Sequence, residues 1–399
     1  LWLTSLTTAI GFASLATARI PVFVEFGLFV AIGVGVSLTF TLLVFLCFPF
    51  KVPPPLPWVD QGLGWLLGWV HRGQASARWR WGLLLAAGII VAGGLPQLRQ
   101  NALLISGLPA DAPIRVQARF FDETFGGSRP LSFLVEPPAG ASPAQVKEGL
   151  AQTEALIRAH YPVAGLLTPA LHRPDLPMMA PDSSRFRFWG LIPDEGSARL
   201  GSRGDAFRAD RDAHPDLETW RIHYTGVGRM VDKNTEETTW QIAQGLVTAL
   251  GLTFGLLLLY FRRWREPLIA VVVNVVPLLL LAAVYGWLGV ELRAGTNIAF
   301  TIAFGIAIDD TMHLLNVYRK QPPEGCDFGA VTRHAGRPVI LTSLVLGLSF
   351  AVLILAQLDS IRVLGLAMAV SAITALLADL FLLPLLLKQV RSSHPTDSS

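Results

Sequence analysis

Eight long runs of apolar residues constrain this chain more than any other feature. They cover about 1–18, 22–49, 79–96, 239–261, 267–288, 296–318, 337–357 and 362–387. A helix of about 20 apolar residues crosses roughly 30 Å of hydrocarbon. Only 15% of the 399 residues are charged, whereas a soluble domain has about a quarter. The sequence therefore predicts an α-helical polytopic membrane bundle.

Basic residues are shared unevenly between the two sides of these spans. If the C-terminus is cytoplasmic, the short inner segments hold thirteen Lys or Arg and the short outer turns hold three. The positive-inside rule predicts this orientation, and it accounts for the net charge of +3 without a nucleic-acid partner. Cys47 and Cys326 then lie at or near the reducing side, so we expect no disulfide.

An internal repeat links the two ends of the chain. A shift of 338 residues aligns 3–49 with 341–387 without a gap, with thirteen of 47 positions identical, including "LTSL" at 3–6 and 341–344. Repeated membrane halves are typical of secondary transporters. The counterpart of Asp309 would precede Leu1, and the first residue is not Met. We therefore expect this sequence to be a fragment that lacks an upstream portion.

Composition and the repeat divide the chain into six predicted segments. They are the last two spans of a first membrane repeat (1–50), a cytoplasmic linker with an interfacial amphipathic helix (51–78), the first span of a second repeat (79–98), an extracytoplasmic α/β domain (99–236), a five-span bundle (237–389) and a disordered cytoplasmic tail (390–399). Prolines at 53–55 predict a turn before the interfacial helix.

Polar residues return in 99–236, and strand and helix patterns alternate there. We predict strands at 131–136, 185–192 and 219–230, a Ser-capped helix at 142–160 and a polar helical segment between the last two strands. This order indicates a small ferredoxin-like α/β sandwich. The following "NTEETTW" (234–240) is expected to cap the next span.

Two adjacent acids, Asp309 and Asp310, lie near the middle of the span at 296–318. A carboxylate at mid-bilayer costs at least about 2.5 kcal/mol, and two neighbouring carboxylates disfavour a doubly charged state. Such a pair can load and release protons, as a proton-coupled pump requires. His313 could reach either acid, and Gly305 would admit a partner helix. Alternatively, the acids hold helices together and His313 caps the inner end.

Other polar residues within the spans have two interpretations each. Asp379 belongs either to a proton path or to helix packing. Thr342 and Ser343 either join that path or hydrogen-bond across helices or to their own backbone. Asn274 and Asn297 favour packing. No Lys occurs in a predicted span, so the sequence identifies no countercharge for the acids.

The α/β region offers no catalytic or cofactor-binding pattern. Its four histidines lack metal-ligand spacing, and "FGGS" (125–128) fits a turn better than a phosphate loop. We therefore expect no enzyme activity, no metal and no cofactor.

Three stretches resemble the resistance-nodulation-division (RND) exporters, in the hydrophobe and lipid branch related to the mycobacterial large membrane proteins (MMPL). They are "GIAIDDTMHLLNVYR" (305–319), "GRPVILTSLVLGLSFAVLIL" (336–355) and "LGLAMAVSAITALLADLFLLPLLL" (364–387). "LTSLTTAIGFASL" and "FGLFVAIGV" resemble the end of the first half of that family, whereas the α/β region matches weakly, mainly at 120–136. The same membrane core is shared with sterol-sensing domains.

The resemblance implies a proton antiporter of the bacterial inner membrane that exports hydrophobic or lipidic molecules. About eight of an expected twelve spans are present, and 99–236 would be a periplasmic porter-like domain. By motif position, Asp309 and Asp310 would carry protons. The runner-up interpretations are a sterol-sensing-like lipid receptor without pumping and a protein-translocation accessory of the same superfamily. The sequence leaves open whether the protein forms a homo-oligomer.

Overall fold

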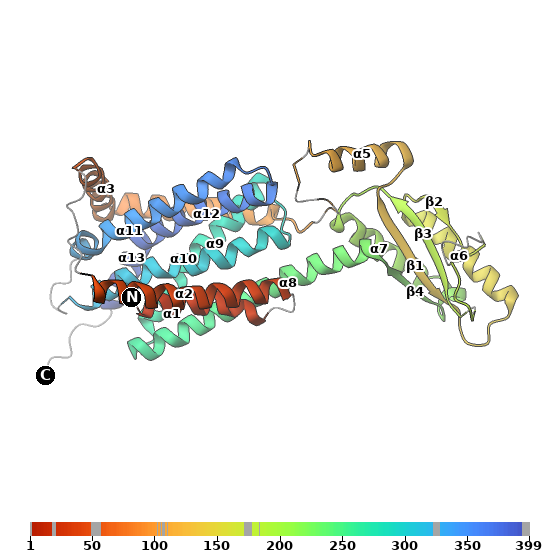
Figure 1. The fold of residues 1–399 in the computed structure, drawn as a ribbon, viewed down its shortest axis with the longest axis horizontal. Helices are drawn as coiled ribbons and strands as arrows, with labels where there is room; N and C mark the ends of the chain where they lie inside the picture. Colours follow the sequence, from red (N-terminus) through yellow and green to blue (C-terminus); the bar gives the residue numbers. More distant parts are fainter. Residues whose placement is uncertain are drawn as a thin grey trace. The chain divides into compact units, whose positions relative to one another are not determined.

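The computed structural model describes residues 2–17, 21–48, 57–101, 103, 105, 108–109, 111–170, 178–182, 184–321 and 328–392. The chain forms two compact units (Figure 1). The membrane unit comprises Leu1–Arg99 and Thr238–Ser399, and the α/β unit comprises Gln100–Glu237. The predicted proline-rich turn at 51–56 lies outside the described residues, as does 393–399 of the predicted tail.

The membrane unit is almost entirely helical. Its helices are α1 (Trp2–Ala13), α2 (Pro21–Cys47), α3 (Pro57–Ala75), α4 (Ala77–Gly94), α9 (Arg265–Leu288), α10 (Ala294–Arg319), α11 (Phe328–Ala351), α12 (Asp359–Leu377) and α13 (Leu383–Ser392). The long helix α8 (Val227–Phe261) belongs to both units. A π-helical turn, Ala378–Leu382, joins α12 to α13 without a break.

Seven helical segments in the described part of the chain are long and apolar enough to cross a membrane. The polytopic bundle is therefore confirmed, with one change in detail. The run at 1–18 was expected to span, but it forms a shorter apolar helix, Trp2–Ala16. Its α-helical part ends at Ala13, where a 3₁₀ turn (Ser14–Thr17) begins.

The two stretches of the predicted internal repeat have similar local geometry. The 3₁₀ turn at Ser14–Thr17 has its counterpart, 338 residues later, at Val352–Leu355, and α2 and α12 then begin at the equivalent residues Pro21 and Asp359. Gly27 and Gly365 pack on equivalent backbone: an added Cβ would lie 2.4 Å from the Phe12 carbonyl oxygen and 2.7 Å from that of Phe350, respectively. Both glycines are required because the helices approach so closely.

Helix α8 begins earlier than expected. The predicted strand at 219–230 ends at Thr225, where Gly226, with a φ of +90°, turns the chain directly into α8. The residues 234–240 therefore lie within this helix, and the prediction that they cap it is wrong. Glu236 and Glu237 favour a helix interior, so their presence did not mark its start.

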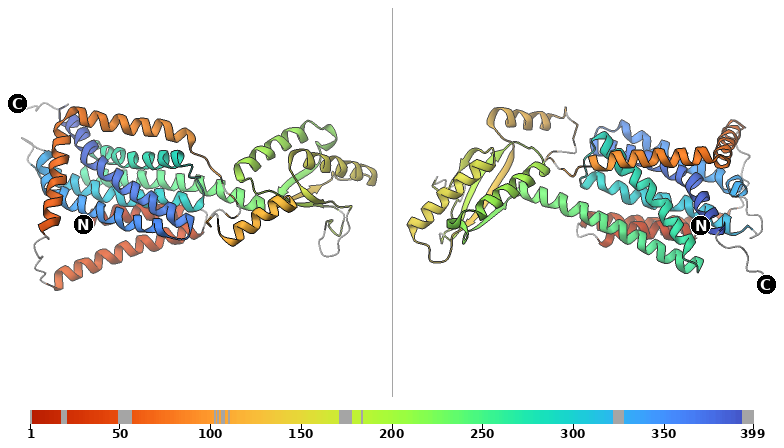
Figure 2. Two further views of the ribbon diagram at one scale, coloured as in Figure 1. Left: turned by 90° about the horizontal axis from the view of Figure 1, so that it is seen from above. Right: turned by 180° about the vertical axis from the view of Figure 1, so that it is seen from behind.

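Helix α3 runs across the ends of the long helices (Figures 1 and 2). Its apolar side, with Leu63 and Val70, packs against Ile340 of α11 and Phe381 of the π turn. Gln74 donates a hydrogen bond to the Leu380 carbonyl oxygen at 2.7 Å. This contact links α3 to the backbone of the π turn. The predicted amphipathic helix thus docks on protein along one side.

The α/β unit is a ferredoxin-like sandwich. Its elements are α5 (Pro113–Phe125), β1 (Arg129–Glu136), α6 (Pro143–His160), β2 (Ala164–Leu167), β3 (Phe186–Ile192), α7 (Ser197–Asp212) and β4 (Arg221–Thr225). The antiparallel sheet has the order β2-β3-β1-β4, which is that of a β-α-β-β-α-β motif. Ser142 forms a capping box with Gln145, so the Ser-capped helix is confirmed.

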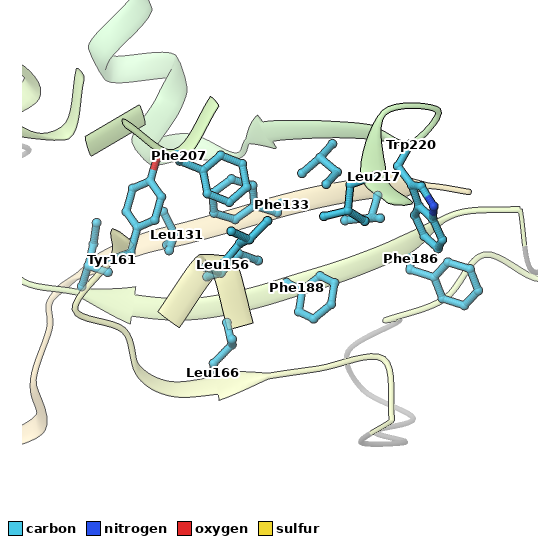
Figure 3. Packing of buried hydrophobic residues seen from close by; sticks show 14 of the residues in the cluster. Leu131, Phe133, Leu156, Tyr161, Leu166, Phe186, Phe188, Phe207, Leu217 and Trp220 are labelled. Carbon is cyan, nitrogen blue, oxygen red and sulfur yellow. The ribbon is translucent and has the colours of Figure 1, made fainter. Parts of the chain in front are cut away.

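Alternate residues of the strands build the core of this sandwich. Figure 3 shows Phe133 of β1 beside Tyr161 and Phe207, and the ring centroids of these two residues lie 5.5 Å and 5.1 Å from that of Phe133. Trp220 and Leu217 close one end of the cluster. Side chains of a strand point alternately to opposite faces, so the period-two pattern at 131–136 already indicated these inward positions.

A buried arginine ties the sheet to the first turns of α8. Arg129, fully buried, donates to Asp194 at 2.8 Å, to the Gly228 carbonyl oxygen at 2.9 Å and to Asp232. Burial by itself disfavours the guanidinium charge, but the hydrogen bonds and charges of the two carboxylates outweigh it and raise the pKa of Arg129. The sequence did not indicate this cluster, because its members are 65 and 103 residues apart.

Candidate functional site

Helix α10 brings the Asp-Asp pair into the centre of the membrane unit. Asp310 is 8% exposed and Asp309 is half-buried. Gly305, one turn earlier, lies against α1: an added Cβ would be 3.0 Å from the Phe12 ring, and Thr8 donates to the Gly305 carbonyl oxygen at 3.2 Å. The first repeat therefore packs directly beside the acids.

Hydroxyl groups of α11 contact Asp310. Ser343 donates to one carboxyl oxygen at 2.6 Å, and Thr342 lies 3.4 Å from the other. Both hydroxyls also lie within reach of backbone carbonyls one turn earlier, with Ser343 2.8 Å from the Val339 oxygen. Each hydroxyl has one proton to donate, so it can turn between the carboxyl group and its own helix.

A second polar chain crosses three helices. Thr311 of α10 donates to Asp379 at 2.6 Å and accepts a hydrogen bond from the Asn274 amide of α9 at 2.9 Å. Asp379 is 1% exposed and lies in the π turn. Its other carboxyl oxygen is buried, with no partner in the described part of the chain. The wider backbone spacing of this turn places the carboxyl group against α10.

The other predicted residues are not joined to these networks. His313 is exposed, and within the described ranges it forms no hydrogen bond to Asp309 or Asp310. Asn297 instead donates to Thr239 of α8 at 2.8 Å. No basic side chain in the described residues forms an ion pair with Asp310 or Asp379. Their hydrogen-bond partners are hydroxyl groups.

A narrow cavity adjoins Asp310 and Ser343. It runs between α10, α11 and α12 and is lined mainly by apolar groups, among them Phe350 and Met368. Ser371 of α12 also lines it, and its buried hydroxyl has no partner among the described residues. A polar group in such a position can hold a water molecule, and a water molecule there would lie in the same cavity as Asp310.

Sequence reasoning missed Thr311 and Ser371 and assigned Asn274 to packing alone. Thr311 directly follows the Asp pair, and this position is the only signal in the sequence. Asn274 is an amide inside an apolar run, but its partner depends on the rotation of α9 relative to α10. Among the described residues, no cluster of three or more His, Cys, Asp or Glu could hold a metal ion.

The profile of the MMPL family matches residues 174–394, more than half of the chain. This chain belongs to the MMPL family. It is thus a multi-pass membrane protein of the RND superfamily. The matched residues of this MMPL protein include every polar group placed around Asp310 and Asp379.

Among solved structures, the MMPL chain is similar to SecDF in its super-membrane-facing form. The sequence identity is 14% and the TM-score is 0.46, over 98% of this chain and 48% of that structure. The chain thus spans about half the length of the SecDF structure. A search of curated proteins gave no match.

Proposed function

We propose that this chain is the proton-driven part of a secondary antiporter that exports hydrophobic or lipidic molecules across a bacterial inner membrane. In this proposal Asp309 and Asp310 take up and release protons, and Asp379 is a further residue that binds and releases a proton. The C-terminus is cytoplasmic, and 99–236 forms a periplasmic porter-like domain. The observation that carries the proposal is the contact of buried Asp310 with two hydroxyls of α11.

The hydrogen bonds of Asp310 depend on its protonation. An ionised carboxylate only accepts, so Ser343 and Thr342 can both donate to it. The neutral acid must donate its own proton, and a hydroxyl that previously donated to that oxygen has to turn to its backbone carbonyl. Because these hydroxyls belong to α11 and the acid to α10, protonation changes the contact between two helices.

The chain of Asn274, Thr311 and Asp379 extends the same effect to α9 and α12. While Asp379 is ionised, Thr311 donates to it and accepts from Asn274. When Asp379 is neutral, its proton can be donated to Thr311, whose hydroxyl then turns toward the Ala307 carbonyl oxygen, 3.4 Å away. Proton uptake therefore acts on the packing of four helices, which is the mechanical step that an antiporter requires.

The test uses the complete protein that contains this chain, reconstituted in vesicles with an NBD-labelled phospholipid. Transfer of the probe to the outer leaflet is followed by dithionite quenching, with and without an imposed pH gradient. We expect Asp309→Asn with Asp310→Asn to abolish the gradient-dependent transfer, because neither amide can exchange a proton. Asp359→Asn, at the start of α12, is the matched control and should leave transfer unchanged.

The two variants also separate this function from the others. A lipid receptor binds the probe without needing a titrating pair, so unchanged behaviour of the double variant would reject the pump. Proton flux without any probe transfer, lost in the double variant, would instead indicate a different cargo, such as a translocated protein.

A further inference from the structure

A second hollow lies on the other side of the π turn, away from Thr311. It is a groove between α4, α9 and α12–α13, here called the α4 groove. Six of its apolar lining residues are Leu83, Leu84, Val276, Leu280, Leu377 and Leu385. All of them lie within candidate membrane spans. The groove therefore opens where lipid chains surround the protein, and its occupant must be apolar along most of its length.

Arg80 is the charged residue among the groove-lining side chains. It lies in the first turn of α4 and is only half-exposed. Its Nε is buried and has no hydrogen-bond partner in the described part of the chain. A buried donor without an acceptor costs about 1–3 kcal/mol, and more for a charged group. The groove therefore presents a cationic side chain with one unsatisfied buried donor beside an apolar wall.

Two tryptophans place Arg80 at the level of the lipid headgroups. Trp79 and Trp81, its neighbours in α4, are both exposed, and Trp is enriched where a bilayer meets water. Basic pockets between membrane helices on the cytoplasmic side bind anionic headgroups. In the orientation proposed above, the start of α4 lies on that side.

We propose that the α4 groove binds an anionic phospholipid of the inner leaflet. One acyl chain lies along Leu84 and Leu280, and the phosphate accepts hydrogen bonds from Arg80. Phe381 and Ala378, which also line the groove, belong to the π turn that carries Asp379 on its opposite side. The bound lipid therefore contacts the turn that holds the second acid in place.

The experiment is native mass spectrometry, in detergent, of the same protein that the transfer assay uses, with dioleoylphosphatidylglycerol or dioleoylphosphatidylcholine added at equal concentration. We expect phosphatidylglycerol adducts to exceed phosphatidylcholine adducts by about fivefold, the value of one basic contact to an anionic lipid. Arg80→Gln should remove this excess. Arg78→Gln is the matched control, because Arg78 lies within one helical turn of Arg80 in α4. Arg78 is exposed and does not line the groove.

A second pair of variants tests the apolar part of the groove. Ala87→Trp fills the groove and should reduce adducts of both lipids, whereas Ala86→Trp, on the exposed side of α4, should not. If Arg78→Gln and Arg80→Gln reduce the phosphatidylglycerol excess equally, the proposal is overturned, and the lipid is attracted by surface charge alone. Undiminished adducts of both lipids in Ala87→Trp would also overturn it. Because the readout is binding, failure here leaves the proton-coupled function untouched.

Discussion

Replacing Arg129 with leucine should loosen the α/β unit far more than the loss of an ordinary ion pair. Arg129 is fully buried and lies between Asp194 and Asp232, whose side chains are 13% and 7% exposed. The variant removes the guanidinium to which both carboxylates are hydrogen-bonded. Breaking a buried ion pair from one side costs about 3–5 kcal/mol, so we expect a loss of this size in the α/β unit.

Hydrogen exchange of the β1 amides measures this loss locally. Since about 1.4 kcal/mol corresponds to a factor of ten, the expected loss accelerates exchange by about 100-fold to about 4,000-fold. Arg158→Leu is the control. Arg158 pairs with Glu154 within α6, and the two side chains are 49% and 33% exposed. A helical surface pair contributes about 0.3–0.5 kcal/mol, so exchange should change by about twofold.

A third variant checks the cause. Adding Asp194→Asn and Asp232→Asn to Arg129→Leu also removes the two carboxylate charges, and most of the lost protection should return, because neutral replacement of a buried ion cluster costs little. If β1 exchange in Arg129→Leu stays within threefold of the unaltered protein, the electrostatic reasoning is refuted. If the triple variant is no better protected than the single one, the loss comes from packing rather than from charge.

Two further predictions concern the membrane unit. Gly365→Ala should lower the free energy of unfolding by about 1–3 kcal/mol, because the added Cβ would lie 2.7 Å from the Phe350 carbonyl oxygen. Gly33→Ala is the control, because nothing lies within 4 Å of a Cβ added there. It should be neutral or should stabilise the protein by up to about 1 kcal/mol. Thermal unfolding in detergent compares the two, and equal melting temperatures would contradict the close approach. Gln74→Ala should speed hydrogen exchange at the π turn, since the Leu380 carbonyl loses its side-chain donor. Gln61 is exposed, so Gln61→Ala should leave this exchange unchanged. Identical exchange in both variants would show that Gln74 does not support the turn.

The sequence by itself determined the elements whose signal is local. Apolar length predicts spans because unpaired backbone is too costly in hydrocarbon. Alternation at 131–136 predicts β1, and Ser142 predicts the start of α6, because the capping contacts lie within one turn. The repeat could also be recognised from the sequence, since close packing at Gly27 and Gly365 requires glycine at matching positions.

Only the tertiary structure decided which polar groups meet. Asp379 reaches Thr311 because a π turn displaces its carboxyl group, and no local pattern at 378–382 predicts that turn. Arg129 precedes the predicted strand at 131–136, and the fold surrounds it with acids from two distant segments. His313, one turn from the acids in sequence, faces away from the described bundle. Burial and partners depend on how helices rotate against one another, and that rotation follows from the sum of many contacts rather than from any short stretch of sequence.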